Sequence, residues 1–386
     1  MKDLQSLLQA RLPHGVRSEF IDNGNGLLNH VLCAGENHPD KPVALLLHGF
    51  PELAFSWRRI MLPLAEAGYF VIAPDQRGYG LTIDQSHGNR IGPISYETPL
   101  DSYNLINLAR DAIGLINALG HHQVELLVGH DFGSPVAGWS ALIRPDIFKR
   151  VVMMSAPFAG PPALPNPTLP PAAPGIDIQA LSRLSPPRKH YQRYYSTEPA
   201  DRDMMNAPDG LHQFLRDYYH AKSADWPGNS PHPLEEQSPQ ALAVMPHYYI
   251  MEQNQTMPQA VLASRPAPDQ VAQCDWLPDR DLAVYAAMFQ ATGFQAALQW
   301  YRCGSSGQFR QAYQLFGGRH IEPPSCFIAG RQDWGVYQKP GDLTRMEQAV
   351  CMNYQGTTLI EGAGHWVQQE QPQQVADLLV KFCRGS

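Results

Sequence analysis

The sequence has no long apolar stretch. No run in it approaches the roughly 20 apolar residues that a membrane-spanning helix needs, and the first fifteen residues, MKDLQSLLQARLPHG, are interrupted by polar and charged side chains. They lack the continuous apolar centre of a secretory signal. We therefore expect a soluble, cytoplasmic protein that has no membrane partner.

Basic residues and cysteines are also few. The 29 Lys and Arg are outnumbered by 36 Asp and Glu, which gives a net charge of −7. Nucleic acids and anionic membranes require clustered basic residues, so we expect no nucleic-acid partner. The six cysteines are widely spaced and form no C-x-x-C pair, which favours buried reduced thiols over a disulfide framework or a zinc site. We expect neither a metal ion nor an organic cofactor.

What the sequence does contain is a series of short apolar runs rich in Val, Ile and Leu. They lie at residues 43–47, 69–73, 124–128, 151–154, 325–329 and 357–360. Runs of this length and continuity are typical of parallel strands that are buried on both faces. Helix-compatible segments such as 105–119 lie between them. Alternating strands and helices predict an α/β protein with helices on both faces of a mostly parallel sheet.

The pattern changes after residue 157. Seven prolines fall between Pro161 and Pro174, which breaks helix and strand regularity, and a mostly helical, tyrosine-rich stretch follows to about residue 310. Because two core-type strands come after this stretch, one core with an inserted cap is a simpler interpretation than two successive domains. We predict a core formed by residues 1–157 and 312–386 and a helical cap formed by residues 158–311.

The segment VELLVGHDFGSPVAG, residues 124–138, indicates a reactive residue on a sharp turn. A strand runs into GHDFG and a helix follows, with glycines two residues on either side of Asp131, as in a nucleophile elbow. A carboxylate is ionised at neutral pH and can attack an sp3 carbon directly, forming an alkyl ester with the enzyme. The alternative from this segment alone is that Asp131 only caps the following helix.

Two motifs after other strands supply the partners that such a nucleophile needs. GRQD, residues 330–333, follows the run at 325–329, and GAGHW, residues 362–366, follows the last run. The order Asp131, Asp333, His365 is the nucleophile, acid and histidine order of α/β-hydrolases. We expect His365 to activate water as a general base, and Asp333 to hold its tautomer and stabilise the imidazolium.

A third motif, HGFPE at residues 48–52, follows the first predicted strand. In proteins with a nucleophile elbow, this loop and the residue after the nucleophile supply the backbone N–H groups of the oxyanion hole. Phe50 and Phe132 are the residues at those positions. The alternative is that HGFPE forms an ordinary Gly-Pro turn.

These motifs, together with DQRGYG at residues 75–80, resemble those of the epoxide hydrolases of the α/β-hydrolase superfamily. The resemblance covers both halves of the core. It implies an α/β-hydrolase core with a mostly parallel, doubly wound sheet and an inserted helical cap. It also implies that a small-molecule epoxide and water react to give a vicinal diol, with no cofactor. We expect His48, Pro51 and Trp366 to contact the substrate, and we leave open whether the protein is a homodimer.

Two cap segments are similar to the tyrosine segments of that family. They are YQRYY at residues 191–195 and QWYR at residues 299–302. The resemblance implies that Tyr191 and Tyr301 hydrogen-bond the epoxide oxygen, where two phenols would stabilise the developing alkoxide. Tyr194 and Tyr195, at helical spacing from Tyr191, are rivals for its role. The remaining alternative is that these cap tyrosines only pack.

Other activities on the same fold compete with this interpretation. Haloalkane dehalogenases hold the halide with side-chain N–H donors, which Phe50 and Phe132 lack. Fluoroacetate and related haloacid dehalogenases place Arg, not Phe, after the nucleophile. Serine esterases are disfavoured because Ser134 lies three residues beyond the elbow position. A non-enzymatic ligand receptor also stays open, although such a protein would often have lost a catalytic residue, and here each part is present.

Overall fold

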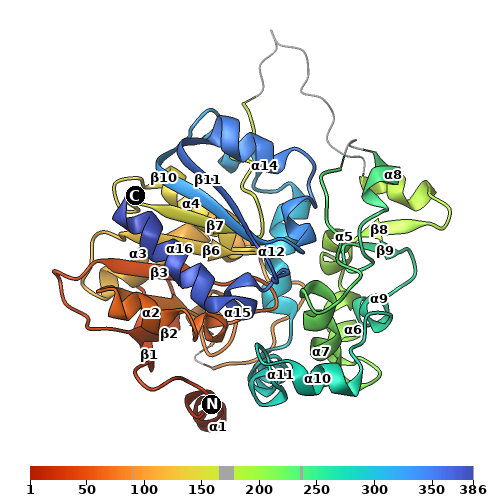
Figure 1. Ribbon diagram of the computed structural model, residues 1–386, viewed down its shortest axis with the longest axis horizontal. Helices are drawn as coiled ribbons and strands as arrows, with labels where there is room; N and C mark the ends of the chain where they lie inside the picture. Colours follow the sequence, from red (N-terminus) through yellow and green to blue (C-terminus); the bar gives the residue numbers. More distant parts are fainter. Residues whose placement is uncertain (89, 165–177, 235–237, 386) are drawn as a thin grey trace.

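The computed structural model describes residues 1–88, 90–164, 178–234 and 238–385. Most of the proline-rich segment expected at 161–174 lies outside the described residues. Figure 1 shows the large sheet and its surrounding elements on one side of the molecule and the helices of residues 191–273 on the other. Both termini lie on the side of the sheet.

One large sheet organises the molecule. Its nine strands run in the order β1-β2-β4-β3-β6-β7-β10-β11, and β5 pairs with β2. The strands are β1 (Arg17–Asp22), β2 (Leu27–Ala34), β3 (Val43–Leu47), β4 (Phe70–Pro74), β5 (Ile83–Asp84), β6 (Leu126–His130), β7 (Val151–Met154), β10 (Ile321–Gly330) and β11 (Cys351–Ile360). All pairs from β4 to β11 are parallel, whereas β2 is antiparallel to β1, β4 and β5.

The predicted apolar runs form the centre of this sheet. Every residue of β3, β4, β6 and β7 is buried, as expected for parallel strands covered on both faces. The predicted strands at 43–47 and 151–154 have the observed bounds, and the others are displaced or extended by a few residues. Strands β1 and β2 were not predicted. All residues of β1 are partly or fully exposed at the sheet edge, so the strand lacks the apolar signal of the central ones.

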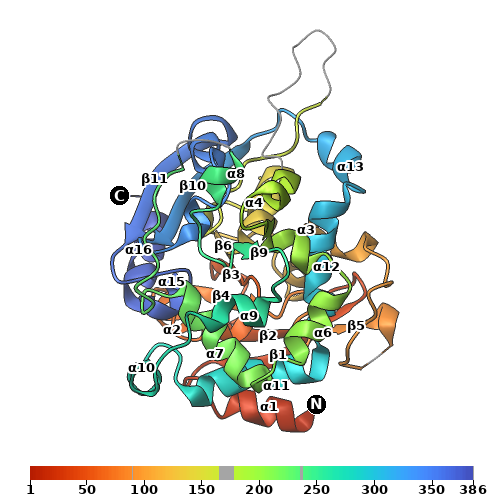
Figure 2. The same ribbon diagram turned by 90° about the vertical axis from the view of Figure 1, so that its right-hand side faces the viewer.

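Helices cover both faces of the sheet. The helices outside the segment between β7 and β10 are α1 (Lys2–Gln9), α2 (Met61–Glu66), α3 (Leu105–Ala118), α4 (Gly133–Ile143), α14 (Asp342–Arg345), α15 (Val367–Glu370) and α16 (Pro372–Arg384). Helices α3 and α4 pack together on one face, while α2 and α16 lie on the other, as Figure 2 shows. This arrangement confirms the predicted α/β class with a mostly parallel sheet between two helical layers.

Local sequence explains where the helices begin. The side chain of Asn104 accepts the backbone N–H groups of Ile106 and Asn107 and so caps α3 at its first turn. Helix α4 is buried along most of its length, because it is packed between α3 and strands β6 and β7. Among the described residues, no helix combines the length and the apolar character needed to cross a bilayer.

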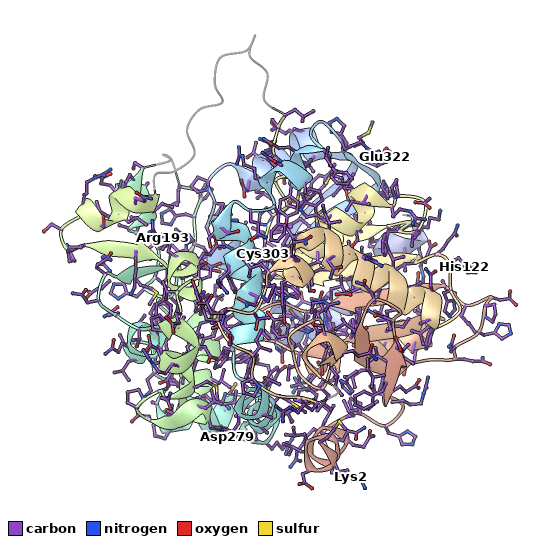
Figure 3. All side chains as sticks on the ribbon, turned by 180° about the vertical axis from the view of Figure 1, so that it is seen from behind. Lys2, His122, Arg193, Asp279, Cys303 and Glu322 are labelled. Carbon is purple, nitrogen blue, oxygen red and sulfur yellow. The ribbon has the colours of Figure 1, made fainter. Side chains whose placement is uncertain are left out.

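The chain between β7 and β10 forms a separate group of elements. They are α5 (Tyr191–Tyr195), α6 (Pro199–Met205), α7 (Gly210–Lys222), α8 (Pro239–Leu242), α9 (Met257–Leu262), α10 (Pro268–Gln273), α11 (Asp279–Thr292), α12 (Gln295–Ser306), α13 (Arg310–Gln314) and the antiparallel pair β8 (Arg188–His190) and β9 (Ile250–Glu252). All strands of the large sheet precede or follow this segment. We propose that it is the cap, and its limits at 158 and 311 stay a prediction. Figure 3 labels Cys303 on α12, at the centre of the view where this group meets the core.

Candidate active site

Asp131 lies on the turn between β6 and α4, in the left-handed backbone region with φ of 50°. Asp and Asn adopt this region more readily than most residues that carry a side chain. The turn is tight enough to require its glycines. A Cβ on Gly129 would lie 2.1 Å from the carbonyl oxygen of Gly133, and one on Gly133 would lie 2.3 Å from that of Leu47. This geometry lifts the Asp131 side chain above the carboxyl ends of the central strands.

Three predicted residues meet at this point. His365 Nε2 lies 3.1 Å from Asp131 Oδ2, and His365 Nδ1 lies 3.0 Å from Asp333 Oδ1. The same Oδ1 accepts the backbone N–H of Gly335 at 2.7 Å, which fixes the orientation of the acid. All three side chains are buried. The structure therefore places His365 between two carboxylates, in the geometry of a triad.

The three residues of the triad shift one another's pKa values. Burial raises the pKa of Asp131, but the hydrogen bond and charge of His365 outweigh it and hold the pKa well below its usual range. For His365, burial and the Lys222 ammonium lower the pKa, but Asp333 and Asp131 together outweigh them and leave it raised. The pKa of Asp333 is lowered despite burial, chiefly by the charge of His365. Asp131 is consequently ionised at neutral pH.

Two backbone donors border the Asp131 carboxylate. The N–H of Phe50 donates to Oδ1 at 2.9 Å. A Cβ added to Gly49 would lie 2.4 Å from that oxygen and 2.7 Å from the backbone nitrogen of Phe132. The Phe132 nitrogen and Asp131 Oδ1 thus both lie close to Gly49, next to the Phe50 N–H. These two N–H groups suit an oxyanion that develops on Oδ1.

A cavity of about 240 Å³ opens beside the nucleophile. Its polar wall includes Asp131, Tyr191, Tyr301 and Gln338, and its apolar wall includes the rings of Phe132, Trp139 and Phe158. The ring centroids of Tyr191 and Tyr301 are 6.0 Å apart. The structure thus brings both predicted phenols to one cavity with the carboxylate.

The two phenols differ in their partners. The Tyr191 hydroxyl donates to Gln338 Oε1 at 2.9 Å and accepts from Gln192 Nε2 at 3.1 Å. The Tyr301 hydroxyl makes no hydrogen bond with another described residue. Burial and the charge of Asp131 raise both phenol pKa values well above the usual value, so both hydroxyls keep their protons and can donate.

The rivals of Tyr191 point elsewhere. The Tyr194 hydroxyl donates to Asp203 at 3.2 Å, and the Tyr195 hydroxyl donates to that of Tyr218 at 3.2 Å. Neither residue lines the cavity beside Asp131. Among the three tyrosines of α5, Tyr191 is the one in position to meet a ligand there.

Three residues expected to contact the substrate do not line this cavity. His48 is fully buried, donates from Nδ1 to the Gly49 carbonyl and accepts at Nε2 from the Gln76 N–H. Pro51 is buried, and its carbonyl accepts the Tyr219 hydroxyl. Trp366 stacks edge-on against His365 and donates its indole N–H to the Tyr219 carbonyl. Their contacts hold the loops of the site in place, and a contact with substrate stays a prediction.

Several polar residues around the site were not identified from the sequence. Glu52 bonds His130 Nδ1 at 2.6 Å, and His130 Nε2 bonds the His365 carbonyl at 2.7 Å. Both residues belong to the motifs HGFPE and GHDFG, so the motifs themselves contained the signal. Gln338 and Lys222 belong to no motif. Gln338 lies in the core shortly after Asp333 and meets Tyr191 of the cap, and Lys222 reaches the site only because the cap folds onto the core.

Lys222 is a buried cation close to the triad. It is 3% exposed, and its ammonium lies 4.9 Å from the ring centroid of Tyr249 and 5.4 Å from those of Tyr218 and Trp366. Rings at such distances stabilise a cation through their quadrupoles. Within the described ranges, no group of three or more His, Cys, Asp and Glu side chains is arranged to hold a metal ion.

Comparison with known proteins places this chain in a family. Residues 42–183 match the model of the alpha/beta hydrolase fold. The chain is 31% identical to epoxide hydrolase A of Mycobacterium tuberculosis over 96% of its own length and 98% of that protein. Among solved structures, an epoxide hydrolase from an endophytic Streptomyces has a TM-score of 0.74 at 26% identity, covering 97% of this chain and 96% of its own. Epoxide hydrolase A from Mycobacterium thermoresistibile has a TM-score of 0.72 at 29% identity, covering 96% and 98%.

Proposed function

The chain belongs to the epoxide hydrolases of the α/β-hydrolase fold, and we propose that it converts epoxides to vicinal diols through an ester on Asp131. One observation carries the proposal. A buried, ionised carboxylate shares a single cavity with two protonated phenols, Tyr191 and Tyr301. That set can attack a ring carbon from one side while it receives the departing oxygen on the other.

In the first step, Asp131 Oδ2 forms a bond with an epoxide carbon. The carbon–oxygen bond of the ring breaks, and its electron pair passes to the epoxide oxygen. The phenols of Tyr301 and Tyr191 donate hydrogen bonds to this oxygen, and one of them supplies the proton and regains it from water. Since Tyr191 is bonded to Gln338 in the free protein, its hydroxyl has to exchange that acceptor for the epoxide oxygen.

In the second step, His365 Nε2 removes a proton from a water molecule that attacks Cγ of the ester. Negative charge develops on Oδ1, which already lies 2.9 Å from the Phe50 nitrogen, and the Phe132 N–H is the second donor. The Cγ–Oδ2 bond then breaks, and the leaving oxygen takes the proton from His365 to complete the diol. The Asp131 carboxyl, which now contains an oxygen from water, releases its proton to the solvent, which balances the proton that the phenol took from water and restores the carboxylate. Asp333 stabilises the transient imidazolium.

The scheme predicts where the oxygen atom of the attacking water ends up, and this can be measured. In a single turnover in ¹⁸O-water, with enzyme in excess over epoxide, the label is expected in the Asp131 carboxylate and not in the diol. Mass spectrometry of the peptide that contains Asp131 and of the product measures both. Label in the diol after one turnover would contradict the ester and would indicate direct attack by water.

A carbon–halogen bond is the other target for the same nucleophile. A halide needs N–H or similar donors, and the side chains that flank Asp131, Phe50 and Phe132, provide none. A panel of aryl, aliphatic and terpene epoxides beside haloalkanes, scored for diol and for halide, separates the two activities. Halide release without diol formation would overturn the proposal.

A further inference from the structure

The carboxylate of Glu370 lies behind the loop that carries His365. It accepts three backbone N–H groups: that of Gly364 at 2.9 Å, that of Trp366 at 2.9 Å and that of Ala224 at 2.8 Å. Gly364 and Trp366 are the neighbours of the histidine in the chain. Ala224 comes from the turn that follows α7 in the cap.

The backbone N–H of His365 is held as well, but by the cap. It donates to the Lys222 carbonyl at 2.8 Å. The approach is close, because a Cβ on Gly364 would lie 2.6 Å from that same carbonyl oxygen. Three consecutive amides, 364 to 366, are therefore fixed by Glu370 and by cap residues 222–224. We call these four hydrogen bonds the amide clamp.

We propose that Glu370 is a positioning residue. Through the amide clamp it holds the His365 side chain in the position needed for hydrolysis of the Asp131 ester, and it makes that position depend on the docking of the cap. This inference rests on the proposed function. His365 has to keep Nε2 near Asp131 while Nδ1 keeps its partner Asp333, at 3.1 and 3.0 Å. Displacements of about 1 Å in such a group can slow a reaction about 100-fold.

The chemistry of the position supports a role beyond stability. Burial is the largest influence on the Glu370 carboxyl and raises its pKa to about 7, although the three N–H donors favour the charged form. Ionising the carboxyl in this place therefore costs more free energy than ionising a glutamate in water. Two carboxylate oxygens can accept three N–H donors at once, which an apolar side chain cannot do and a glutamine amide does only in part.

Comparing the rates of the two reaction steps distinguishes a positioning role of Glu370 from a general loss of structure. Ring opening uses Asp131 and the phenols and does not require His365 as a base, whereas ester hydrolysis does. In Glu370→Gln, the amide group places N–H against N–H and breaks part of the clamp. We expect ester formation to keep its rate within about twofold, ester hydrolysis to slow by about 10- to 100-fold, and the ester to accumulate.

The experiment is single-turnover quench and mass spectrometry on wild type and variants. Glu361→Gln is the matched control, because Glu361 is an exposed carboxylate of the same loop region, paired with the exposed Arg331. Ala224→Pro is the second variant: it removes the cap donor and places the proline Cδ where that N–H pointed, so the Glu370 carboxylate has to move away. Ser223 before it has φ of −85° and ψ of 171°, a conformation that a following proline favours. It should slow hydrolysis and leave ester formation near its wild-type rate.

The outcomes are distinct. Slow hydrolysis with normal ester formation in both variants supports the clamp. Wild-type hydrolysis rates in either variant, or equal slowing of both steps, would overturn it, and Ala224→Pro decides the question alone if Glu370→Gln does not fold. Failure of the proposed function appears differently, because then wild type itself forms no ester on Asp131.

Discussion

The Phe50 backbone N–H donates to Oδ1 of Asp131, although the two residues are 81 positions apart in the chain. The free protein therefore already holds one carboxylate oxygen against the donor that we assign to the oxyanion. The other oxygen, Oδ2, faces His365. The two oxygens of one side chain have separate environments, which predicts that Oδ2 attacks and that Oδ1 becomes the ester carbonyl.

Replacing the base should trap the intermediate. In His365→Gln we expect ester hydrolysis to fall by about 10²- to 10⁴-fold, because no group remains to activate water. Intact-protein mass spectrometry should then show an adduct, and peptide analysis should locate it on Asp131. His122→Gln is the control, since Figure 3 labels His122 at the outer edge of the core. A variant that turns over epoxide without any adduct would contradict the covalent scheme.

Removing one phenol should act on the first step. For Tyr301→Phe we expect ring opening to slow by about 10²- to 10³-fold, because a donor to the developing alkoxide is lost, with ester hydrolysis nearly unchanged. Rapid-quench measurement of ester formation tests this. Tyr195→Phe is the control, because the Tyr195 hydroxyl bonds Tyr218 and does not line the cavity. If Tyr301→Phe slows both steps equally, Tyr301 only packs.

Acid should separate the two steps. The pKa of Asp131 is held well below its usual range, so the nucleophile stays ionised as the pH falls. His365 has to be neutral to accept a proton, and its raised pKa rests partly on its hydrogen bond to the Asp131 carboxylate, which the ester removes. We expect the pKa that governs hydrolysis to lie below that of the free protein. Below it the ester should accumulate, and rate constants for both steps measured across pH would show this. A parallel decline of both steps would contradict it.

The charge of Lys222 should influence the pH below which ester hydrolysis slows, which is the acid limb of its pH profile. Its ammonium lowers the pKa of His365, so in Lys222→Met we expect that pKa to rise and the acid limb of ester hydrolysis to move to higher pH. Lys222→Arg keeps the charge and should leave the limb near its wild-type position. An identical pH profile in wild type and Lys222→Met would show that the charge has no effect on the base.

Two glycines should respond in opposite ways to alanine. A Cβ on Gly49 would lie 2.4 Å from Cβ and Oδ1 of Asp131, so Gly49→Ala should displace the nucleophile and reduce activity by more than about 100-fold. Gly304, in α12, has no atom within 4 Å of an added Cβ. Gly304→Ala should raise the free energy of unfolding by about 0.5–1 kcal/mol. Denaturant unfolding measures the second effect. An active Gly49→Ala variant would exclude the close contact.

The site was predictable where its residues sit in short motifs at strand ends. The structure brings Asp131, Asp333 and His365 together because parallel strands end at one edge of the sheet, and each of the three follows a strand that the apolar runs predicted. Tyr191 could not be separated from Tyr194 by spacing alone. Only the partners of the side chains in the folded cap distinguish them.

What the sequence could not reveal depends on contacts between distant segments. Lys222 is the last residue of the tyrosine-containing helix α7 and belongs to no motif, and Glu370 becomes a partner of Ala224 only when the cap docks. His48 is the opposite case, a motif residue whose surroundings the sequence did not reveal. It lies in a motif next to the nucleophile, but its hydrogen bonds with Gly49 and Gln76 turn it into the interior. Proximity in sequence therefore did not predict which side chains reach the cavity.

The hydrogen bonds between cap residues 222–224 and the histidine loop also limit how substrate can travel. A cap that swung open as a hinged lid would pull on the His365 N–H and on Glu370 and so dismantle the base in every cycle. From the proposed amide clamp we therefore expect epoxide and diol to pass through the cavity while the cap stays docked. The rings of Trp139 and Phe158, which pack together with centroids 6.0 Å apart, line that cavity, and we expect them to select substrates by size. We expect substrates to be selected both by whether they can pass through the cavity and by how they fit at Asp131.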